Sequence, residues 1–371
     1  MNTGGFHLAI AAGGTGGHIL PGIETGRALL ASVQDSRVTW LSGGRDIEEH
    51  IYTSRGIQPL RLRSGAYRGA GKALVSKAEM VADTGAALRH FRRDCPDAVL
   101  AFGGGASAPV LVAANLLRIP IFLHESNAVA GRTTRKFSRH ARRVFLGMAD
   151  CQGQTGLLTG TPTQLPETPL LPPAERDLVL CMGGSQGASG LNELFLGALA
   201  DPRLTGMPVQ FHLVTGPGKD TLPLPGNATR AKLTISEYEP DMRRLLSRAR
   251  LAVSRAGAGT LADLAVHGVP ALLVPYPHAM DDHQAANAMY YAGRGAAEMV
   301  RQEELRPEDL AGRLAGLLGS ENRLSAMSAA MSGLSHQDAA HRVIGTILSE
   351  LGVACAAGGS PMTERTTGAT G

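Results

Sequence analysis

The chain has 371 residues, of which 43% are hydrophobic and 4% aromatic, and it contains 47 glycines. This length suits two domains, and the glycine content favours layered α/β structure with many tight turns over a β-sandwich. The net charge of +4 is uneven, because residues 1–160 carry +8 and the remainder carries −4. The first half therefore favours an anionic neighbour: a nucleic acid, a phosphate-bearing substrate or an anionic membrane.

The four cysteines, at positions 95, 151, 181 and 355, are widely spaced and form no C-x-x-C pair. Neither a disulfide framework nor a zinc site is therefore predicted. The N-terminal sequence MNTGGFHLAI lacks the basic segment and apolar stretch of an export signal. No apolar run reaches the ~20 residues that cross a bilayer. We expect a cytoplasmic protein that contacts a membrane only peripherally.

Short apolar segments that end in glycine or polar residues recur along the first half of the chain. This pattern predicts buried parallel strands that alternate with helices, as in a doubly wound sheet. A helix is expected at Pro21–Ser32, after the first strand. The predicted strands are Phe6–Ala12, Val38–Leu41, Ala98–Phe102, Ile121–Leu123 and Val144–Leu146.

A proline-rich segment at residues 161–173 predicts a stiff, extended linker between a domain at 1–160 and a second at 174–335. An amphipathic helix within residues 336–355 is expected to pack back on the first domain. The small polar residues 356–371 predict a disordered tail. The second half is expected to hold a helix at Leu191–Ala200 and strands at Leu178–Met182, Val209–Val214, Lys232–Ile235, Leu251–Val253 and Ala271–Val274.

The sequence GGTGGH at residues 13–18 lies between the first predicted strand and the following helix. Glycines let the backbone approach a phosphate closely, and a helix N-terminus adds positive potential and N–H donors. A plain tight turn is the alternative interpretation. A nicotinamide or flavin site is disfavoured, because Ile19 occupies the third glycine position of G-x-G-x-x-G. No G-K-[ST] follows, which excludes a P-loop.

Two further clusters follow predicted strands of the first half, GGGAS at residues 103–107 and HESN at residues 124–127. Because ligands of open α/β sheets bind outside the carboxyl ends of the strands, all three clusters are expected to converge on one site. For His124, a structural hydrogen bond and a contact with substrate are equally compatible with the sequence.

The second half carries matching clusters. GGSQGA at residues 183–188 offers backbone donors to a second phosphate, and SRAGAGT at 254–260 leads into a helix that carries Asp263. That carboxylate suits ribose hydroxyls, or it only complements the helix dipole. The segment 277–287 contains His278, Asp281, Asp282 and His283, which suit sugar hydroxyls better than a metal ion, because no D-x-D cluster accompanies them.

Basic residues are concentrated between positions 132 and 143. Several of them fall on one helical face, which is either a solvated surface or a docking patch for anionic lipid headgroups. They are Arg132, Arg135, Lys136, Arg139, Arg142 and Arg143.

These motifs together resemble the MurG family, the UDP-N-acetylglucosamine:lipid I N-acetylglucosaminyltransferases of peptidoglycan synthesis. The resemblance rests on GGTGGH at 13–18, HESNAVAG at 124–131, GGSQGA at 183–188, SRAGAGTLAD at 254–263 and DDHQAANA at 281–288, and it extends over residues 6–350. It implies a GT-B fold, in which two Rossmann-like α/β domains face an interdomain cleft.

The resemblance implies that UDP-GlcNAc binds mainly to the second domain. Its donor-binding residues would be Tyr238 and Met242 at the uracil, Asp263 at the ribose, Ser185, Gln186 and Ala258 at the diphosphate, His283, Gln284 and Asn287 at the sugar, and Thr15, Gly16, Gly17, Asn127 and Gln164 facing the donor. Lipid I, undecaprenyl-diphospho-MurNAc-pentapeptide, would use the first domain. Its candidate residues are Gly13, Gly14, Gly103, Gly104, Gly105 and His124.

Three positions depart from the family pattern. Gly105 stands where the family usually has Tyr, Ser126 where it has Gln, and Gln164 where it has Arg. The missing arginine removes a cationic contact to the substrates. Gln164 can still form hydrogen bonds but supplies no charge.

The expected reaction is an inverting displacement in which the 4-hydroxyl of MurNAc attacks C1 of GlcNAc and UDP leaves. His18, at a helix start that keeps its imidazole neutral, is the candidate base, and Glu125 is the alternative. No cofactor is expected to be required, although a divalent cation is possible, and no nucleic acid partner is expected. A UDP-sugar epimerase of the same fold and a non-catalytic nucleotide-sugar or lipid-binding module stay open as alternatives.

Overall fold

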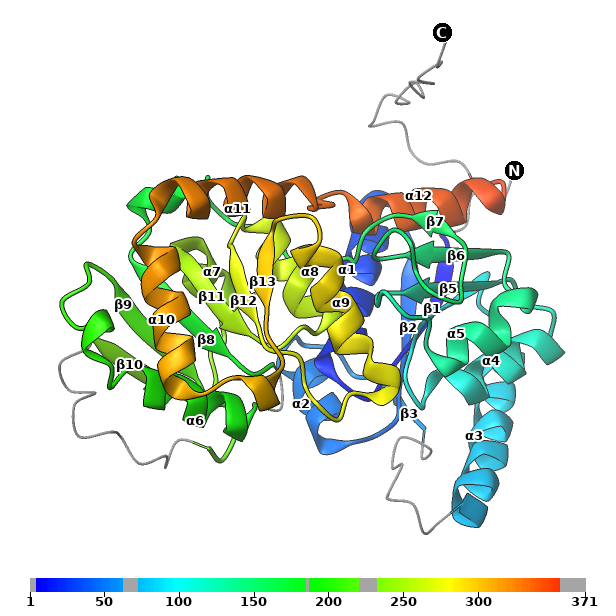
Figure 1. Ribbon diagram of the computed structural model, residues 1–371. Helices are drawn as coiled ribbons and strands as arrows, with labels where there is room; N and C mark the ends of the chain where they lie inside the picture. The colour runs from blue at the N-terminus through cyan, green and yellow to red at the C-terminus, as the bar shows by residue number, and fades with distance from the viewer. Residues whose placement is uncertain (1–4, 63–72, 185–186, 220–231, 354–371) are drawn as a thin grey trace, which may run out of the picture.

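The structure is a computed structural model that describes residues 5–62, 73–184, 187–219 and 232–353. The described residues form two parallel sheets that lie side by side in an elongated molecule, each covered by helices (Figure 1). This architecture confirms the predicted α/β class, with two doubly wound units of the GT-B type. No helix in these ranges is both long and apolar enough to cross a membrane.

The first sheet has seven parallel strands in the order β3-β2-β1-β4-β5-β6-β7. Strand β1 lies between β2 and β4, so the direction of winding reverses there, and the loops after β1 and β4 lie at the switch point where α/β sheets bind ligands. The strands are β1 (His7–Ala12), β2 (Arg37–Ser42), β3 (Leu60–Arg61), β4 (Ala98–Gly103), β5 (Ile121–Glu125), β6 (Arg143–Leu146) and β7 (Leu157–Leu158).

Helices cover both faces of this sheet, and apolar side chains fill the space beneath them. Strand β1 is buried on both faces, which explains its continuous apolar sequence. The helices of this half are α1 (Gly16–Ser32), α2 (Asp46–Thr53), α3 (Ala73–Arg93), α4 (Ser107–Leu116) and α5 (Arg132–Phe137).

The second sheet has six parallel strands in the order β10-β9-β8-β11-β12-β13. Its switch point lies between β8 and β11, and the two glycine-rich segments of this half follow these strands. The strands are β8 (Leu178–Met182), β9 (Gln210–Val214), β10 (Leu233–Ser236), β11 (Ala249–Ser254), β12 (Ala271–Leu273) and β13 (Ala297–Met299).

The helices of the second half complete its two layers, and α11 and α12 run one after the other along one side of the molecule (Figure 1). Helix α12 packs against α1, and four of its residues, Val343, Ile344, Ile347 and Leu348, are buried in the core of the first sheet. The helices are α6 (Ser189–Ala198), α7 (Met242–Arg248), α8 (Ala258–Val266), α9 (His283–Ala292), α10 (Pro307–Leu318), α11 (Glu321–Gly333) and α12 (Ala339–Glu350).

Residues 161–172 connect the two sheets, and the short helix η2 (Pro173–Glu175) ends the connection. The buried guanidinium of Arg176 holds it to the second domain by donating hydrogen bonds to the carbonyl oxygens of Leu171, Ala249 and His267, at 2.9, 3.2 and 3.0 Å. Burial lowers the pKa of this guanidinium from its usual value. The connection is therefore anchored at its C-terminal end.

Several boundaries differ from the sequence-based prediction. Helix α1 begins at Gly16 and not at Pro21, which lies inside the helix. Proline favours the first turn of a helix, and this preference placed the predicted start too late. The strands β3, β7 and β13 were not predicted; they have two or three residues each and show no continuous apolar run long enough to indicate a buried strand.

Candidate active site

The first glycine segment connects β1 to α1, and a carboxylate from a different element holds it. Glu48 on α2 is fully buried, and its Oε1 accepts a hydrogen bond from the backbone N–H of Gly14 at 2.7 Å. Its Oε2 accepts one from Gly43 N–H at 2.6 Å. Gly14 itself has a φ of 96°, a conformation that favours glycine. Sequence analysis did not identify Glu48, because its partners are backbone groups of other segments.

The second glycine segment, after β4, packs directly on the first. Gly104 has a φ of 81°, and a Cβ atom built on it would lie 2.1 Å from the carbonyl oxygen of Gly13. Only glycine therefore permits the two backbones to approach this closely. Ser107, at the start of α4, donates to the Gly103 carbonyl oxygen at 2.6 Å. Gly105 is exposed, in the turn before α4.

His18 lies in the first turn of α1, between these two segments. Its Nδ1 donates to the carbonyl oxygen of Gly13 at 3.2 Å, which leaves Nε2 as the acceptor of the neutral ring. A Cβ on Gly103 would lie 3.4 Å from this Nε2. Burial lowers the pKa of His18 below its usual value, although the nearby Glu125 carboxylate opposes this shift. The ring is therefore neutral and able to accept a proton at neutral pH.

Glu125, the alternative base, holds the loop that follows β5. Its Oε1 accepts from the backbone N–H and the side-chain amide of Asn127, both at 3.1 Å. Its Oε2 accepts from Gly131 N–H at 2.8 Å and from the Thr134 hydroxyl at 2.7 Å. These four bonds fill the accepting capacity of a carboxylate. In this arrangement Glu125 shapes the loop and has no lone pair left for a substrate proton.

His124 is 1% exposed and lies inside the first domain. Its Nε2 donates to the carbonyl oxygen of Gly160 at 3.0 Å, and its Nδ1 accepts from the Ser126 hydroxyl at 3.2 Å. The ring stacks on Phe102 with centroids 4.9 Å apart. Burial lowers the pKa of His124 to about 4. Of the two interpretations left open by the sequence, this geometry favours the structural hydrogen bond.

The loop after β8 contains the GGSQGA motif, of which Ser185 and Gln186 lie outside the described residues. Gly187 has a φ of 66°, and a Cβ on it would lie 2.1 Å from the carbonyl oxygen of Thr215. The buried Asn192 of α6 donates to that same oxygen at 3.0 Å. The loop is thus held against the end of β9.

The loop after β11 brings the N-terminus of α8 against the first domain. A Cβ on Gly259 would lie 3.6 Å from the Cα of Gly17, so the two glycine-rich helix starts meet across the interface. Ala258, the first residue of α8, is buried. The Gly257 peptide precedes it in extended conformation, which leaves the first amides of α8 without partners inside the helix.

Asp263, in α8, contacts the connection between the domains. The Thr163 hydroxyl donates to its Oδ1. Burial raises the pKa of Asp263 to about 6, the Thr163 bond opposes this rise, and Glu24 of α1 adds to it. The neighbouring Gln164 donates its side-chain amide to Glu24 Oε1 at 3.1 Å. Thr163 is a second residue that sequence analysis did not identify.

Helix α9 carries the three residues predicted to bind the sugar, and they differ in exposure. His283 is partly exposed, and its Nδ1 donates to the carbonyl oxygen of Met280 at 2.7 Å. Gln284 uses its Oε1 to accept from the backbone N–H groups of Ala256 and Tyr276, at 3.2 and 3.0 Å. Asn287 is fully buried and bonded to the first domain. His283 and Gln284 are therefore more accessible than Asn287.

Tyr238 and Met242, predicted at the uracil, lie before and at the start of α7. Tyr238 is 51% exposed, and its ring lies 5.9 Å from that of His50 on α2, at 76°. Met242 packs partly buried against the core of the second domain. The first domain thus contributes His50 beside the position expected for the uracil ring.

The acidic residues before α9 are engaged by arginines. Asp281 accepts from Arg135 of α5, and Asp282 accepts from Arg301, both at 2.9 Å. Among the residues that the structure describes, no group of three or more His, Cys, Asp and Glu side chains could hold a metal ion.

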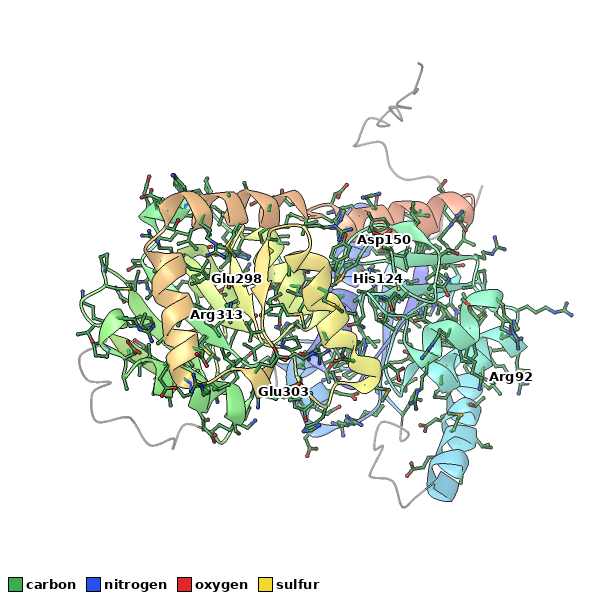
Figure 2. The ribbon with its side chains drawn as sticks, viewed as in Figure 1. Arg92, His124, Asp150, Glu298, Glu303 and Arg313 are labelled. Atoms are coloured by element: carbon green, nitrogen blue, oxygen red, sulfur yellow. The ribbon has the colours of Figure 1, made fainter. Side chains whose placement is uncertain are left out.

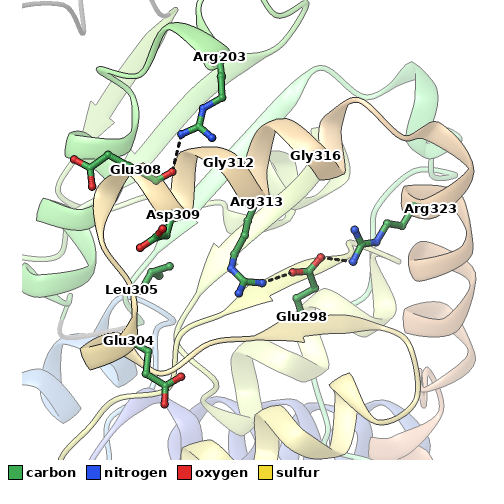
Figure 3. Close-up of a pocket in the computed structure, with 10 residues that line it drawn as sticks. All are labelled: Arg203, Glu298, Glu304, Leu305, Glu308, Asp309, Gly312, Arg313, Gly316 and Arg323. Atoms are coloured by element: carbon green, nitrogen blue, oxygen red, sulfur yellow. Dashed lines mark hydrogen bonds and ion pairs between the residues drawn. The ribbon is translucent and has the colours of Figure 1, made fainter.

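A separate cavity of about 620 Å³ lies on the second domain, away from these loops (Figure 3). The side chain of Glu298 lies in it between Arg313 and Arg323, at 3.1 and 2.7 Å (Figure 3). Because both arginines are already paired with Glu298 and no predicted site residue lines the cavity, we do not assign the site there.

Both halves of the chain match known protein families. The model of the glycosyltransferase family 28 N-terminal domain matches residues 8–146, and that of the C-terminal domain matches residues 178–343. A protein of Halorhodospira halophila named UDP-N-acetylglucosamine–N-acetylmuramyl-(pentapeptide) pyrophosphoryl-undecaprenol N-acetylglucosamine transferase is 39% identical over 93% of this chain and 98% of its own length.

A protein of the same name from Hahella chejuensis is 37% identical over 92% of this chain and 97% of its own length. Among solved structures, the crystal structure of Acinetobacter baumannii MurG superposes with a TM-score of 0.76 at 28% identity. It covers 93% of this chain and 99% of its own. The similarity therefore extends through both sheets and the loops between them.

Proposed function

This chain belongs to the MurG family within glycosyltransferase family 28, and we infer that it transfers N-acetylglucosamine from UDP-GlcNAc to lipid I. The product is lipid II, which is used for peptidoglycan synthesis. The observation that carries this function is the meeting of glycine-rich loops from both domains, where Gly259 approaches Gly17 and His18 lies beside the contact. Two diphosphate-bearing substrates can be held there from opposite sides.

The donor is proposed to bind mainly to the second domain. The first amides of α8, at Ala258 and Gly259, suit its diphosphate, since a helix N-terminus offers N–H donors and positive potential. Asp263 lies about one turn further on. Its Oδ2 has no partner within the described ranges, so it can accept from a ribose hydroxyl. Ser185 and Gln186 keep the diphosphate role that the resemblance implies.

The sugar is proposed to contact His283 and Asn127. His283 is partly exposed at the start of α9, and Asn127 keeps one side-chain N–H that the hydrogen bond to Glu125 does not use. Both N–H groups of the Asn287 amide are engaged by the protein, whereas Gln284 uses its Oε1 and keeps its Nε2. Gln284 can therefore donate to a sugar hydroxyl, and Asn287 is proposed to support the sugar site from behind it.

The acceptor diphosphate is proposed to lie on the first domain, at the start of α1. The N–H of Gly14 is already bonded to Glu48, so this amide is not available to a phosphate. The amides of Gly16 and Gly17, which open α1, have no partner inside the helix and are better placed. The glycine segment at residues 103–105 packs on Gly13 and beside His18, so it borders the same space.

The proposed mechanism is a single inverting displacement. His18 Nε2 removes the proton from the 4-hydroxyl of MurNAc as that oxygen attacks C1 of GlcNAc, and UDP leaves with the electron pair of the broken bond. A base near neutral pKa contributes about 10²–10⁴-fold. Backbone N–H groups of α8 stabilise the charge that develops on the leaving diphosphate. We propose that no metal ion is required.

One experiment separates this function from its alternatives. Purified protein is incubated with radiolabelled UDP-GlcNAc and a lipid I analogue, and the products are resolved by chromatography. Labelled lipid II supports the transferase. A free epimerised sugar nucleotide would indicate an epimerase, and binding without any product would indicate a non-catalytic module.

A peripheral membrane contact is proposed for the first domain. Met80 and Val81 on α3 and Leu116 on α4 are 40%, 74% and 63% exposed, and these two helices pack together. Exposed apolar side chains beside basic ones are typical of surfaces that enter the headgroup layer. At the end of α4, close to Leu116, Arg118 and Arg142 line a cavity of about 220 Å³.

The basic segment at residues 132–143 offers fewer unpaired positive charges to a membrane than its sequence suggests. Arg135 pairs with Asp281, Arg143 pairs with Glu350, and Arg142 donates to the Glu350 carbonyl oxygen. Arg132, Lys136 and Arg139 are exposed, and each such charge near an anionic surface is worth about 1 kcal/mol. Sedimentation with vesicles tests this contact. Binding to anionic but not zwitterionic vesicles, weakened by Val81→Asp, supports it, and equal binding to both would contradict it.

A further inference from the structure

We propose that Asn287 is a positioning residue that sets the relative placement of the two domains and aims Asn127 at the donor sugar. Asn287 is fully buried in α9, and its hydrogen bonds reach the loop after β5 in the first domain. The role in catalysis rests on the proposed function, whereas the role in domain placement does not.

The side-chain amide of Asn287 accepts one hydrogen bond from the protein and uses both of its N–H groups as donors. Its Oδ1 accepts from the backbone N–H of Ala128 at 2.8 Å. Its Nδ2 donates to Asn127 Oδ1 at 3.1 Å and to the carbonyl oxygen of Ala256 at 3.0 Å. A primary amide has only two N–H hydrogens, so none remains for a sugar hydroxyl.

The backbone partners fix which way both amides point. A backbone N–H can only donate and a carbonyl oxygen can only accept, so Ala128 and Ala256 together determine the orientation of the Asn287 amide. The Nδ2 of Asn287 then requires the oxygen of Asn127 to face it. The amide nitrogen of Asn127 is consequently directed toward Glu125, and its second N–H is left for a ligand.

Each end of this connection is rigid within its own domain. On α9, Gln284 precedes Asn287 by one turn and accepts from Ala256 N–H. Ala256 is therefore held at both its N–H and its carbonyl oxygen. In the first domain, Glu125 accepts from both the backbone and the side chain of Asn127. A rigid support at both ends makes the asparagine pair a determinant of domain placement.

The two exposed ion pairs between the domains are weaker constraints. The ion pair of Arg135 with Asp281 has side chains that are 47% and 41% exposed. The pair of Arg294 with Asp150 is 37% and 82% exposed. Water and salt screen such pairs, whereas a buried amide that loses its partner is penalised fully. The domain arrangement should therefore depend more on Asn287 than on either ion pair.

The direct test measures the distance between the domains without any ligand. Spin labels are attached at Arg92→Cys on α3 and Glu303→Cys in η6 (Gln302–Glu304), which lie in different domains (Figure 2). The background carries Cys95→Ser and Cys355→Ser, while Cys151 and Cys181 are buried and left in place. Asn287→Ala and Asn287→Asp are compared with Asn322→Ala, an exposed asparagine of α11.

In both Asn287 variants we expect the distribution of distances between the spin labels to broaden or its mean to increase. In Asn322→Ala the distribution should stay unchanged. The aspartate variant keeps the shape and the acceptor but loses both donors, so it decides the outcome if the alanine variant fails to fold. Unchanged distributions in the folded Asn287 variants would overturn the proposal. This result does not depend on whether the protein is a transferase.

A kinetic measurement tests the link to catalysis. We expect Asn287→Asp to lower kcat by about tenfold or more, because misplaced reacting groups lose their alignment, with little change in the Kd for UDP. Loss of discrimination between UDP-GlcNAc and UDP-GalNAc at unchanged domain distances would instead make Asn287 a sugar contact and contradict the proposal.

Discussion

Glu48 Oε1 accepts a hydrogen bond from the backbone N–H of Gly14 at 2.7 Å, so a fully buried carboxylate on α2 holds the first glycine loop. The second oxygen of Glu48 accepts from Gly43 at 2.6 Å, at the end of β2. One carboxylate thus links the loops that follow the neighbouring strands β1 and β2. The loop that carries His18 depends on this support for its shape.

Replacement of Glu48 by Ala should destabilise the protein by about 3 kcal/mol, because two buried N–H groups lose their acceptor. The free energy of unfolding is measured by urea denaturation. Glu193→Ala, at an exposed position of α6, provides the control and should change it by less than about 0.5 kcal/mol. Equal stability of both variants would show that water replaces the carboxylate.

Replacement of His18 by Ala should lower turnover by about 10²–10⁴-fold, because the attacking hydroxyl loses its base. Affinity for UDP-GlcNAc should change little, since the donor is proposed to lie mainly on the second domain. Single-turnover kinetics and calorimetry measure these two quantities. Near-normal turnover would remove His18 from the mechanism.

The pH dependence of activity should reflect the pKa of His18. Burial lowers the pKa of His18, so the neutral ring persists at lower pH than that of a free histidine. Activity should therefore stay constant as the pH falls through 6.5 and decline only below it. An acid limb centred at or above pH 6.5 would contradict a base whose pKa is lowered by its surroundings.

His124 should make stability depend on pH. Its pKa is about 4 in the folded protein and about 6.5 when unfolded, so the unfolded chain binds the proton first as pH falls. Stability that is fully present above pH 6.5 is lost toward pH 4, by about 3 kcal/mol from this group. Urea denaturation at pH 7 and 4.5 should show a smaller loss in His124→Gln than in the wild type. The same substitution at the exposed His278 serves as control.

Asp263 should make donor affinity depend on pH. The carboxylate accepts from ribose hydroxyls when ionised, and its pKa is about 6, so affinity for UDP-GlcNAc should weaken as pH falls through that value. Thr163→Val should move the midpoint upward, because the Thr163 hydrogen bond lowers the pKa. Calorimetry between pH 5 and 8 measures both effects. Asp263→Asn should abolish the dependence, and persistence of it there would assign the titration to another group.

Removal of metal ions should leave most of the activity. Asp281 and Asp282 are paired with Arg135 and Arg301, and backbone amides are available to the leaving diphosphate. Activity is compared before and after treatment with EDTA, with Mg²⁺ added back as the control. Complete loss that Mg²⁺ reverses would assign a metal ion to the segment before α9.

The fold class and the family followed from local signals. Apolar runs such as Leu178–Met182 coincide with the strands, because a strand buried on both faces must be apolar throughout. The glycine clusters lie at strand ends, where parallel strands bring their loops together. Strand β13 has three residues that include Glu298, so it lacks the apolar run that identified the other strands. The start of α1 was misplaced by the preference of Pro21 for a first turn.

The sequence alone determined which segments form the sheets, where the backbone needs glycine, and to which family the chain belongs, because these depend on residue type and local order. Only the tertiary structure decided which polar groups remain open to a substrate. Asn287 and Asn127 are 160 positions apart, and Glu48 reaches a loop 34 positions away. A side chain whose donors are all used by such distant partners cannot also donate to a ligand. The spacing of residues in the sequence does not reveal these pairings.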